Sequence, residues 1–439
     1  MDVRGKKVTV FGMGSSGVAV LDLLRRHGAE VRASDMKPRE ALPEFDAPFV
    51  PQSPEALEDC EIAVLSPGVP ADLPLFEQAR ARGMLVVGDV EAASWFLRGP
   101  ILGITGTNGK TTTTALTGHL LRTAGIACQV GGNIGRPLAA MVDSSREDQW
   151  NVLELSSFQL ETTRTLRVRI AAVLNITQNH LDRHHMMEAY AAAKARILAC
   201  QQPEDFAVLN AENAASAALA RQARGRVRWF CAGGRREPGF WEQDGVLYAE
   251  GKPFMAASEI PLRGRHNLEN VLAAGCCAYL AGAPPEAIRQ GVQTFEGVEH
   301  RLEFVRELGG VRFYNDSKAT SVDATRKALE SFDGRLWVIL GGKDKDSDYR
   351  ELRPLLAERA RAALLIGAAA EKIASHLEGA LPLIPCGDLA TAVRTAWQKA
   401  EPGDTVLLAP ACASFDQFSG YEERGRVFKD LVRTLEQKA

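Results

Sequence analysis

The sequence lacks a hydrophobic run long enough to cross a membrane. No apolar stretch approaches the roughly 18 residues that a membrane-spanning helix requires. Hydrophobic residues nevertheless make up 46% of the 439 positions and charged residues 24%, which excludes a disordered chain and is ordinary for a globular enzyme. The opening stretch "MDVRGKKVTVFGMGSSG" leads directly into a predicted strand and turn, without the features of a secretory signal. We therefore expect a soluble cytoplasmic protein without membrane insertion.

Cysteine motifs are absent as well. The eight cysteines are scattered, without a CxxC pair or zinc-finger spacing, which indicates buried thiols in a reducing compartment and neither a disulfide nor a zinc site. The formal net charge of -3 argues against a general nucleic-acid binder. Short-period repeats and low-complexity tails are also missing. The length suggests about three domains, at roughly 150 residues for each domain.

Short β-like runs alternate with helical segments along the chain. The runs include "KVTVFGMG", "AEVRASD", "IAVLSPGV" and "MLVVGD", then "PILGIT", "WNVLELSS", "IAAVLNIT" and "FAVLNAEN", and finally "LWVILGGKD", "AALLIG" and "TVLLAPACAS". This alternation is typical of parallel sheets, and nearly all-apolar strands indicate helices on both faces. We therefore predict an α/β fold with three domains, at residues 1–90, 91–297 and 298–439.

The stretch "ILGITGTNGKTTTTALTGHLL", residues 101–121, predicts a buried strand, a glycine-rich turn and a helix. The helix N-terminus and the turn amides suit an anion. Lys110 supplies positive charge, and Thr111 offers a hydroxyl to a magnesium ion held by phosphates. The spacing departs from the common phosphate loop, because Ile104 stands where the first glycine is expected. An ordinary turn with a surface lysine is the alternative.

An earlier turn, "VFGMGSSG", also follows a predicted strand. Gly12, Gly14 and Gly17 have the G-x-G-x-x-G spacing, and Asp35 ends the next strand. This pattern alone is typical of NAD binding. A dehydrogenase has no need of a second phosphate loop, however, and such a helix start can bind any diphosphate-ribose ligand, a UDP-sugar included. A purely structural tight turn is the remaining alternative.

Ionisable residues accompany two central strands. Glu154 lies in an apolar run, where burial of an unpaired carboxylate is costly, so we expect a metal or cation partner. In "AAVLNITQNHLDRHH", His180 and Asp182 follow a strand end, which is where open α/β sheets bind ligands. We expect His184 and His185 on the solvated surface.

Six motifs occur in order along nearly the whole chain: "TGTNGKTT", "LELSSFQL", "NITQNHLDRH", "GRHNLENVLAA", "GVEHRLE" and "NDSKAT". They resemble those of the Mur ligases, three-domain ATP-dependent enzymes that form amides in bacterial peptidoglycan synthesis. "LELSSFQLE", "NDSKAT" and "PACASFDQF" are most similar to the D-glutamate-adding members. The Asp-Asn-Pro-Arg type motif expected of the diamino-acid-adding members is absent. The resemblance implies a dinucleotide-fold-like UDP-binding domain, a central P-loop ATPase domain with a mainly parallel sheet, and a C-terminal α/β domain resembling a dinucleotide-binding fold.

The resemblance also implies the binding residues. The UDP-substrate would be held by Gly14, Ser15, Asp35, Ser66, Gly68 and Asn133. ATP would contact Gly106, Thr107, Asn108, Gly109, Lys110, Thr111 and Thr112, together with Asn267, Arg301 and Asp316. D-glutamate would be surrounded by Lys318, Thr320, Lys343, Ser414 and Tyr421. The family has phenylalanine at the last of these positions and an acidic residue where this chain has Gln178.

Metal binding and catalysis follow from the same resemblance. Thr111 and Glu154 would hold one magnesium ion, and His180 would help to bind a second, near a carbamylated Lys194. Lys110, His180 and Lys194 would be the catalytic residues. The pattern "YAAAKARIL" by itself favours the surface for Lys194, and only the resemblance reverses that interpretation.

The implied reaction joins D-glutamate to UDP-N-acetylmuramoyl-L-alanine through an acyl phosphate, in a monomer that acts on small molecules and not on nucleic acid. Because Arg301 and Asp316 belong to the third predicted domain and the phosphate loop to the second, ligands should draw these domains together.

The alternative functions are another Mur-type or folylpolyglutamate-type ligase, a nicotinamide-dependent dehydrogenase, and a non-catalytic nucleotide switch or transport ATPase. The first domain argues against the folate enzyme, and a dehydrogenase leaves Lys110, Glu154 and His180 without a role.

Overall fold

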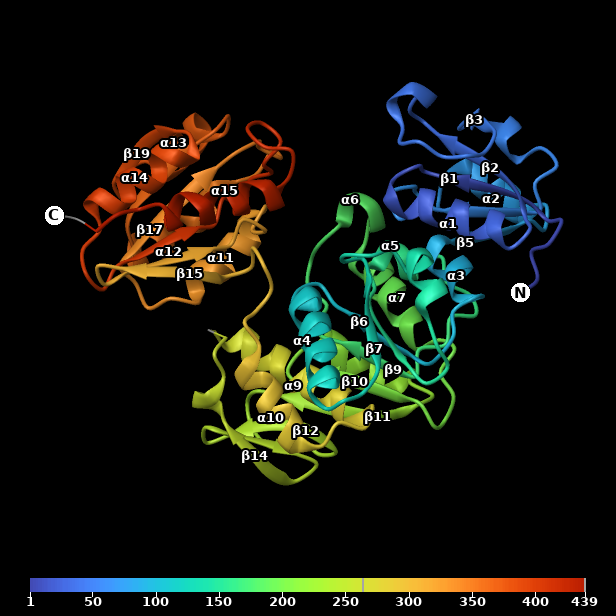
Figure 1. Ribbon diagram of the computed structural model, residues 1–439, viewed down its shortest axis with the longest axis horizontal. Helices are drawn as coiled ribbons and strands as arrows, with labels where there is room; N and C mark the ends of the chain where they lie inside the picture. The colour runs from blue at the N-terminus through green and yellow to red at the C-terminus, as the bar shows by residue number, and fades with distance from the viewer. Residues whose placement is uncertain (263, 438–439) are drawn as a thin grey trace. The chain divides into compact units, whose positions relative to one another are not determined.

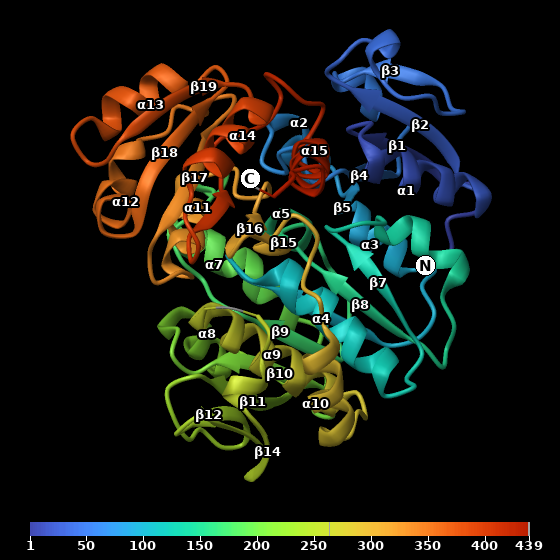
Figure 2. The ribbon, with the colours of Figure 1, turned by 60° about the vertical axis from the view of Figure 1, so that its left-hand side comes forward.

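A computed structural model describes residues 1–262 and 264–437 (Figures 1 and 2). The chain forms two compact units. The first comprises Met1–Pro261 and His266–Phe295, and the second comprises Leu262–Arg265 and Glu296–Ala439. Two sheets lie in the first unit and one in the second, and most strand pairs are parallel. The predicted α/β class with mainly parallel sheets is confirmed. Within the described residues, no helix has both the length and the apolar character needed to span a membrane.

The first sheet has five parallel strands in the order β3-β2-β1-β4-β5. Its strands are β1 (Lys7–Phe11), β2 (Glu30–Asp35), β3 (Phe49–Pro51), β4 (Ile62–Leu65) and β5 (Leu85–Gly88). Its helices are α1 (Ser15–Arg26), α2 (Pro74–Ala81) and α3 (Asp89–Ser94), with short 3-10 turns η1 (Arg39–Ala41) and η2 (Pro54–Leu57). The chain leaves β1 toward opposite sides to form β2 and β4, which places a ligand-binding crevice at their carboxyl ends.

The second sheet has nine strands in the order β14-β13-β12-β11-β10-β9-β6-β8-β7. They are β6 (Ile101–Thr105), β7 (Cys128–Gly132), β8 (Trp150–Glu154), β9 (Ile170–Val173), β10 (Phe206–Asn210), β11 (Arg226–Cys231), β12 (Gly239–Gln243), β13 (Val246–Ala249) and β14 (Lys252–Ala256). Strands β12 to β14 form an antiparallel extension at one edge, at the bottom of Figures 1 and 2. The sequence patterns did not reveal this extension.

The helices of the second sheet include the helix that follows the glycine loop. They are α4 (Lys110–Thr123), α5 (Ser157–Leu160), α6 (Leu181–His184), α7 (Met187–Ala195), α8 (Ala214–Ala218), α9 (Arg265–Leu280) and α10 (Pro285–Thr294). The 3-10 turns are η3 (Leu138–Ser144), η4 (Arg196–Leu198), η5 (Leu219–Arg221) and η6 (Ala257–Glu259). Strand β6 lies between β9 and β8, so this sheet also has a topological switch point, at the start of α4.

One hydrophobic core continues from the first sheet into the second. It contains Val90 and Ala93 of α3 together with Met141 of η3 and Leu153 of β8, which belong to the second sheet and its covering turns. The buried carboxylate of Glu91 adds a polar link, since it accepts hydrogen bonds from the backbone N–H groups of residues 164–166 and from the Thr165 hydroxyl. The two sheets therefore belong to one folded body.

The second unit has a six-stranded sheet in the order β15-β16-β20-β17-β18-β19, parallel except for the β15–β16 pair. Its strands are β15 (Glu303–Leu308), β16 (Val311–Asn315), β17 (Leu336–Gly341), β18 (Ala360–Ile366), β19 (Leu383–Gly387) and β20 (Thr405–Leu408). Its helices are α11 (Val322–Glu330), α12 (Arg353–Arg359), α13 (Ala370–Leu377), α14 (Leu389–Lys399) and α15 (Tyr421–Arg433), with the 3-10 turn η7 (Tyr349–Leu352).

Strand β17 shows how helices cover both faces of this sheet. Leu336, Val338 and Leu340 belong to the core under α11, α12 and α13, whereas Trp337 and Ile339 belong to the core under α14 and α15. Successive side chains of a strand point to opposite faces, so an uninterrupted apolar run must be buried on both sides. The expectation drawn from the apolar runs is confirmed here.

Candidate functional site

The glycine loop 106–109 connects β6 to α4 and is fastened to the end of β9. The backbone N–H of Thr107 donates to the Asn175 carbonyl at 2.8 Å, and that of Asn108 donates to the Asn175 side-chain oxygen at 2.8 Å. Gly109 has a φ of 84°, and a Cβ there would overlap the Asn270 side-chain oxygen. The first turn of α4 carries no acidic residue. The loop therefore has the rigid backbone and the open helix start that bind phosphate.

Two lysines converge on this loop. Lys110 Nζ donates to the carbonyl oxygens of Gly106 and Thr107, both at 2.9 Å, and Lys194 Nζ donates to the same Gly106 oxygen at 2.8 Å. Lys194 is only 1% exposed, so the surface position favoured by the sequence pattern is wrong. Burial lowers the pKa of Lys194 to about 6, with a further decrease from the Lys110 charge that Glu154 opposes. Near neutral pH, Lys194 is mainly a neutral amine.

Glu154 ends β8 beside the loop and is buried. Its Oε1 accepts a hydrogen bond from Asn133 Nδ2 at 2.7 Å, whereas its buried Oε2 has no hydrogen-bond partner among the described residues. An unsatisfied carboxylate oxygen in this position fits a bound cation. No group of three or more His, Cys, Asp or Glu side chains in the described part of the chain forms a ready metal site. A cation at Glu154 would therefore need hydroxyl, carbamate or phosphate oxygens as well.

The segment after β9 brings His180 toward the same region. The His180 ring lies 6.2 Å from the ring of Tyr190, whose hydroxyl is 3.2 Å from Thr107 Oγ1 and whose ring lies 4.5 Å from Lys194 Nζ. His184, expected on the surface, is buried with Nε2 3.0 Å from Ser157 Oγ, so that expectation is wrong.

The sequence singles out three further residues of this segment, namely Gln178, Asp182 and His185. His185 is exposed, as expected, and lies 3.5 Å from a carboxylate oxygen of Asp72. The side chain of Asp182 lies outside the described residues. Gln178, which departs from the family pattern, is exposed.

The earlier glycine turn borders a cavity of about 650 Å³ at the switch point of the first sheet. This volume is in the usual range for small-molecule sites. All of the predicted UDP-substrate residues line it: Gly14, Ser15, Asp35, Ser66, Gly68 and Asn133. Asn133 comes from the second sheet and also donates to Glu154. The cavity therefore adjoins the side chains gathered at the phosphate loop.

The glycines of this turn have different roles. A Cβ at Gly17 would overlap the Gly12 carbonyl oxygen, so Gly17 is required for packing. A Cβ at Gly14 would have no heavy atom within 4 Å, so packing does not require Gly14. Asp35 Oδ2 accepts the Met13 N–H at 2.7 Å. Gly17 is therefore needed to pack the turn, whereas the space beside Gly14 is open to the cavity.

The second unit contains the predicted residues from 301 onward. Asp316 is buried, and burial raises its pKa to about 6 although Arg301, the Leu302 N–H and Lys318 favour the charged form. Lys318 Nζ lies 5.7 Å from the centre of the Tyr421 ring. Asp316, Arg301, Lys318 and Tyr421 therefore form one cluster at the carboxyl end of β16.

A second group adjoins the segment after β20. Lys343 and Ala413 exchange backbone hydrogen bonds at 2.9 and 3.1 Å, which places Lys343 beside Ser414. Lys345 Nζ donates to the Thr320 carbonyl at 3.3 Å. No sequence motif pointed to Lys345, which adds a further cation next to Thr320, a predicted glutamate-binding residue.

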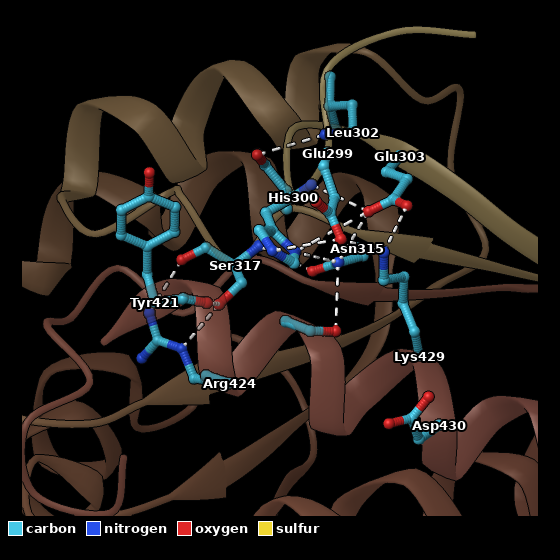
Figure 3. Close-up of polar contacts among 12 residues, drawn as sticks. Glu299, His300, Leu302, Glu303, Asn315, Ser317, Tyr421, Arg424, Lys429 and Asp430 are labelled. Atoms are coloured by element: carbon cyan, nitrogen blue, oxygen red, sulfur yellow. Dashed lines mark hydrogen bonds and ion pairs between the residues drawn. The ribbon is translucent and has the colours of Figure 1, made fainter. Parts of the chain in front are cut away.

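Arg424 of α15 organises the backbone of this region. Its guanidinium is fully buried and donates to the Ser317 carbonyl oxygen at 2.9 Å (Figure 3). It also donates to the carbonyl oxygens of Cys412 and Ala413, at 3.1 and 3.3 Å. Ser317 Oγ in turn donates to the Tyr421 carbonyl at 2.8 Å. Arg424 therefore ties together the segments that carry the predicted glutamate-binding residues.

The buried His300 ring supports the adjacent backbone. Its Nδ1 accepts a hydrogen bond from Asn315 Nδ2 at 2.9 Å, and the same Asn315 nitrogen donates to Glu303 at 3.0 Å (Figure 3). Burial lowers the pKa of His300, so the ring is neutral and Nδ1 can accept. The His300 carbonyl accepts the Lys318 N–H at 3.1 Å. This network fixes the backbone on both sides of Arg301.

Family models match three stretches of the chain. Residues 6–88 match the "Mur ligase MurD-like, N-terminal domain", residues 104–278 the "Mur ligase middle domain" and residues 300–412 the "Mur ligase, glutamate ligase domain". A protein of Solibacter usitatus, named UDP-N-acetylmuramoylalanine–D-glutamate ligase, is 57% identical over the full length of both chains. The chain belongs to the Mur ligase family. The resemblance seen in the sequence motifs is thereby confirmed.

Other Mur ligases agree over similar lengths. A protein of the same name from Acidobacterium capsulatum is 53% identical over 98% of this chain and 97% of its own. The solved structure of UDP-N-acetylmuramate-alanine ligase MurC from Thermotoga maritima shares the fold, with a TM-score of 0.63 and 18% identity over 98% of this chain and 99% of that one. Membership of the Mur ligases makes the chain a ligase and leaves the dehydrogenase and nucleotide-switch interpretations without support.

Sequence reasoning missed several residues that hold the Mur ligase site together. The Tyr190 hydroxyl lies 3.2 Å from Thr107 Oγ1 of the phosphate loop. Asn270 Oδ1 accepts a hydrogen bond from the Thr113 hydroxyl of α4 at 3.2 Å, and Asn270 Nδ2 donates to Asn267 at 3.0 Å. Asn267 itself is a predicted ATP contact. The motif "GRHNLENVLAA" contained a signal for Asn270, because positions three apart share one helix face. Arg424 carried no comparable signal in the sequence.

Proposed function

We propose that this Mur ligase adds D-glutamate to UDP-N-acetylmuramoyl-L-alanine, with conversion of ATP to ADP and phosphate, in peptidoglycan precursor synthesis. The names of relatives at 57% and 53% identity over nearly complete chains support this substrate pair. One observation carries the proposal within the molecule. Asn133 lines the cavity of the first turn and donates to Glu154 beside the phosphate loop. A ligand held by its UDP end in the cavity would therefore extend toward the phosphates of ATP.

Mur ligases use ATP and magnesium. The loop residues Gly106 to Thr112, with Asn267, would bind ATP, and the unpartnered Glu154 Oε2 fits a cation beside Thr111. A bound magnesium ion supplies positive charge that polarises phosphoryl oxygens and offsets repulsion between the reacting anions. We propose a second ion near His180 and a carbamate on Lys194. The lowered pKa of Lys194, about 6, supports this modification, because only a neutral amine attacks carbon dioxide.

The reaction would have two steps. In the first, the alanyl carboxylate of the substrate attacks the γ-phosphorus of ATP, a new carboxyl oxygen to phosphorus bond forms, and ADP leaves. In the second, the neutral amine of D-glutamate attacks the acyl carbon, the tetrahedral intermediate expels inorganic phosphate, and the nitrogen loses a proton. Lys110 would offset the charge that develops on the transferred phosphoryl group, which costs little reorganisation because the loop already fixes its position.

The second unit would supply the amino-acid contacts. Glutamate brings two carboxylates, and lysine ammonium groups suit them. We propose Lys318, Thr320, Lys343, Ser414 and Tyr421 as the glutamate-binding residues. Arg301 and Asp316 would contact the nucleotide. We further propose that the enzyme is a monomer of the cytoplasm, and a sedimentation experiment on the purified chain tests the monomer.

The deciding experiment measures phosphate release from ATP in the presence of UDP-N-acetylmuramoyl-L-alanine and magnesium. Reactions with D-glutamate, L-glutamate, D-alanine, L-lysine and no amino acid are compared, and the nucleotide product is identified by mass. Release that depends on D-glutamate, with a matching new amide, is the expected result. Release indifferent to the amino acid would reduce the activity to an ATPase and contradict the proposed substrate.

A further inference from the structure

One arginine connects the segment of His180 to the nucleotide cavity. Arg183 lies in α6, and its Nη2 donates to the backbone carbonyl oxygen of Val69 at 2.8 Å. The same nitrogen donates to Glu161 Oε1 at 2.6 Å. Val69 lines the cavity of the first sheet, whereas Glu161 follows α5 of the second. The side chain of Arg183 therefore spans the two sheets of the first unit.

Ring contacts continue this connection to His180. The Arg183 guanidinium carbon lies 5.1 Å from the centre of the Phe158 ring, and Phe158 meets the His180 ring edge to face at 4.9 Å. His184 packs on Phe158 in a stacked arrangement at 5.5 Å. The position of Phe158 therefore depends on Arg183, and the position of the His180 imidazole depends on Phe158.

The backbone at His180 needs such support. Its φ of 53° lies in the left-handed region, which a residue with a Cβ adopts only at a cost in free energy. Surrounding contacts must compensate for this cost. Arg183 and Glu161 are suited to that role because their side chains are only 15% and 18% exposed, so salt screens the pair weakly.

We propose that Arg183 is a positioning residue that transmits occupancy of the nucleotide cavity to the His180 segment. The inference rests on the proposed function, in which the cavity holds the UDP end and His180 lies at the reacting end. A ligand that fills the cavity fixes the loop of residues 66–70. The Val69 carbonyl then fixes Arg183, and Phe158 and His180 are held with it.

Hydrogen exchange measures this coupling without turnover. The full-length chain is saturated with UDP-N-acetylmuramoyl-L-alanine in the absence of ATP and magnesium, and amide exchange is followed in peptides that cover residues 178–186. In the unmodified chain we expect the ligand to slow exchange there by about fivefold or more, since opening of the segment then requires loss of the Val69 contact. Unchanged exchange in these peptides at saturation would overturn the proposal.

Arg183→Gln removes the guanidinium and should abolish this protection while the ligand still binds. Arg183→Lys keeps a charged donor that can reach one of the two acceptors, and it should restore part of the protection. The matched control is Arg228→Gln, which breaks an ion pair with Glu250 of 2.8 Å and comparable exposure in the same unit. It should behave like the unmodified chain. Full protection in Arg183→Gln at saturation, or an equal loss in Arg228→Gln, would refute the positioning role.

A second variant keeps the test informative if Arg183→Gln fails to fold. Glu161→Gln leaves the Arg183 guanidinium and its Val69 acceptor in place, so it should keep most of the ligand-induced protection. Loss of protection in Glu161→Gln equal to that in Arg183→Gln would instead assign the effect to the ion pair and contradict transmission through Val69. Melting temperatures of all variants identify any variant that has simply unfolded.

Steady-state kinetics give an independent readout. Arg183→Gln should lower kcat by about tenfold, as expected for a displaced group near the chemistry, with the KM for ATP changed by less than about twofold. Different outcomes contradict the proposed function and the positioning role of Arg183. Phosphate release indifferent to D-glutamate in the unmodified chain contradicts the proposed function alone. D-glutamate-dependent turnover together with full protection in Arg183→Gln contradicts only the positioning role.

Discussion

The two glycine-rich turns of the first unit occupy the same place in their sheets but have opposite electrostatic surroundings. Each turn follows the first strand of its sheet along the chain, at a switch point, and starts a helix, α1 or α4. At the first turn, the Asp35 carboxylate accepts the Met13 N–H. At the second, Lys110 and Lys194 both donate to the Gly106 carbonyl. The backbone provides an anion site in both cases, and the neighbouring side chains decide which anion fits.

This difference supports the ligands proposed for the two turns. A triphosphate carries concentrated negative charge and suits the turn at which Lys110 supplies a positive charge. A diphosphate linked to two sugars carries less charge and many hydroxyl groups, so it tolerates a carboxylate nearby. The comparison therefore explains why a dinucleotide-like glycine pattern accompanies a phosphate loop in one enzyme.

Removal of Lys110 should have the largest effect. Lys110→Ala takes away the group proposed to offset phosphoryl charge, and we expect kcat to fall by about 10³-fold or more, with loss of acyl-phosphate formation. The measurement is D-glutamate-dependent phosphate release. Lys252→Ala, an exposed lysine of β14, is the matched control and should keep normal turnover. Near-normal turnover in Lys110→Ala would remove the electrostatic distinction between the turns.

Two alanine substitutions separate packing from binding within the first turn. Gly17→Ala forces a Cβ onto the Gly12 carbonyl, and we expect it to lower the free energy of unfolding by about 2–3 kcal/mol. Gly14→Ala meets no atom within 4 Å and should leave stability nearly unchanged, while the added methyl group raises the KM for the UDP-substrate. Urea denaturation and initial rates test the pair. Equal destabilisation by both substitutions would favour a purely structural turn.

The pH dependence of stability tests the buried amine of the second turn. The pKa of Lys194 is lowered from 10.5 to about 6 in the folded chain. Between these two pKa values, Lys194 binds a proton in the unfolded chain but not in the folded chain. The contribution of Lys194 to the free energy of unfolding therefore rises with pH, by up to about 1.4 kcal/mol per pH unit, and is constant below about pH 6. Lys194→Met should remove this slope.

Denaturation of both chains in carbon dioxide-free buffer at pH 7 and 8.5 measures the difference, because carbamylation would otherwise change the charge. Lys252→Met should retain the slope of the unmodified chain. An identical slope in Lys194→Met would mean that Lys194 does not have the lowered pKa.

Asp35→Asn should give the smallest change. Asparagine keeps one acceptor oxygen, but the Asp35 carboxylate accepts two backbone N–H groups, from Met13 and Lys37, at 2.7 and 2.9 Å. We expect a loss of about 1 kcal/mol in the free energy of unfolding and a few-fold higher KM for the UDP-substrate. The KM for ATP should not change. An altered KM for ATP would show that the two turns are not separate sites.

Local patterns predicted the parts of the fold that local physics determines. The apolar runs gave the central strands of all three sheets, and the glycine turns were placed correctly between strands and helices. The patterns missed strands β3, β7, β11, β12 to β14, β15, β16 and β19. The edge strands β7, β15 and β19 bury fewer side chains than the central β17, so their sequences carry a weaker apolar signal.

The residues of the candidate site were likewise predictable where a local sequence pattern marks them and not where tertiary packing buries them. Glu154 was detectable because a carboxylate interrupts an apolar strand. The local pattern did not mark Lys194, which only the family resemblance placed in the site, or His184, because their burial results from tertiary packing against the loop and against Phe158. Arg424 was undetectable for the same reason, since its acceptors are backbone carbonyls and the Ser317 hydroxyl, about 10 and 100 residues away. Those contacts become visible only when the chain is folded.

The Glu91 carboxylate determines where this chain can be divided. A fragment that ended after α3 would carry Glu91 without the N–H groups of residues 164–166 and would expose half of a continuous hydrophobic core. The second unit, by contrast, has two cores of its own. Fragment expression, domain-swapping and split-reporter designs should therefore keep residues 1–295 whole and place their junction just after Phe295.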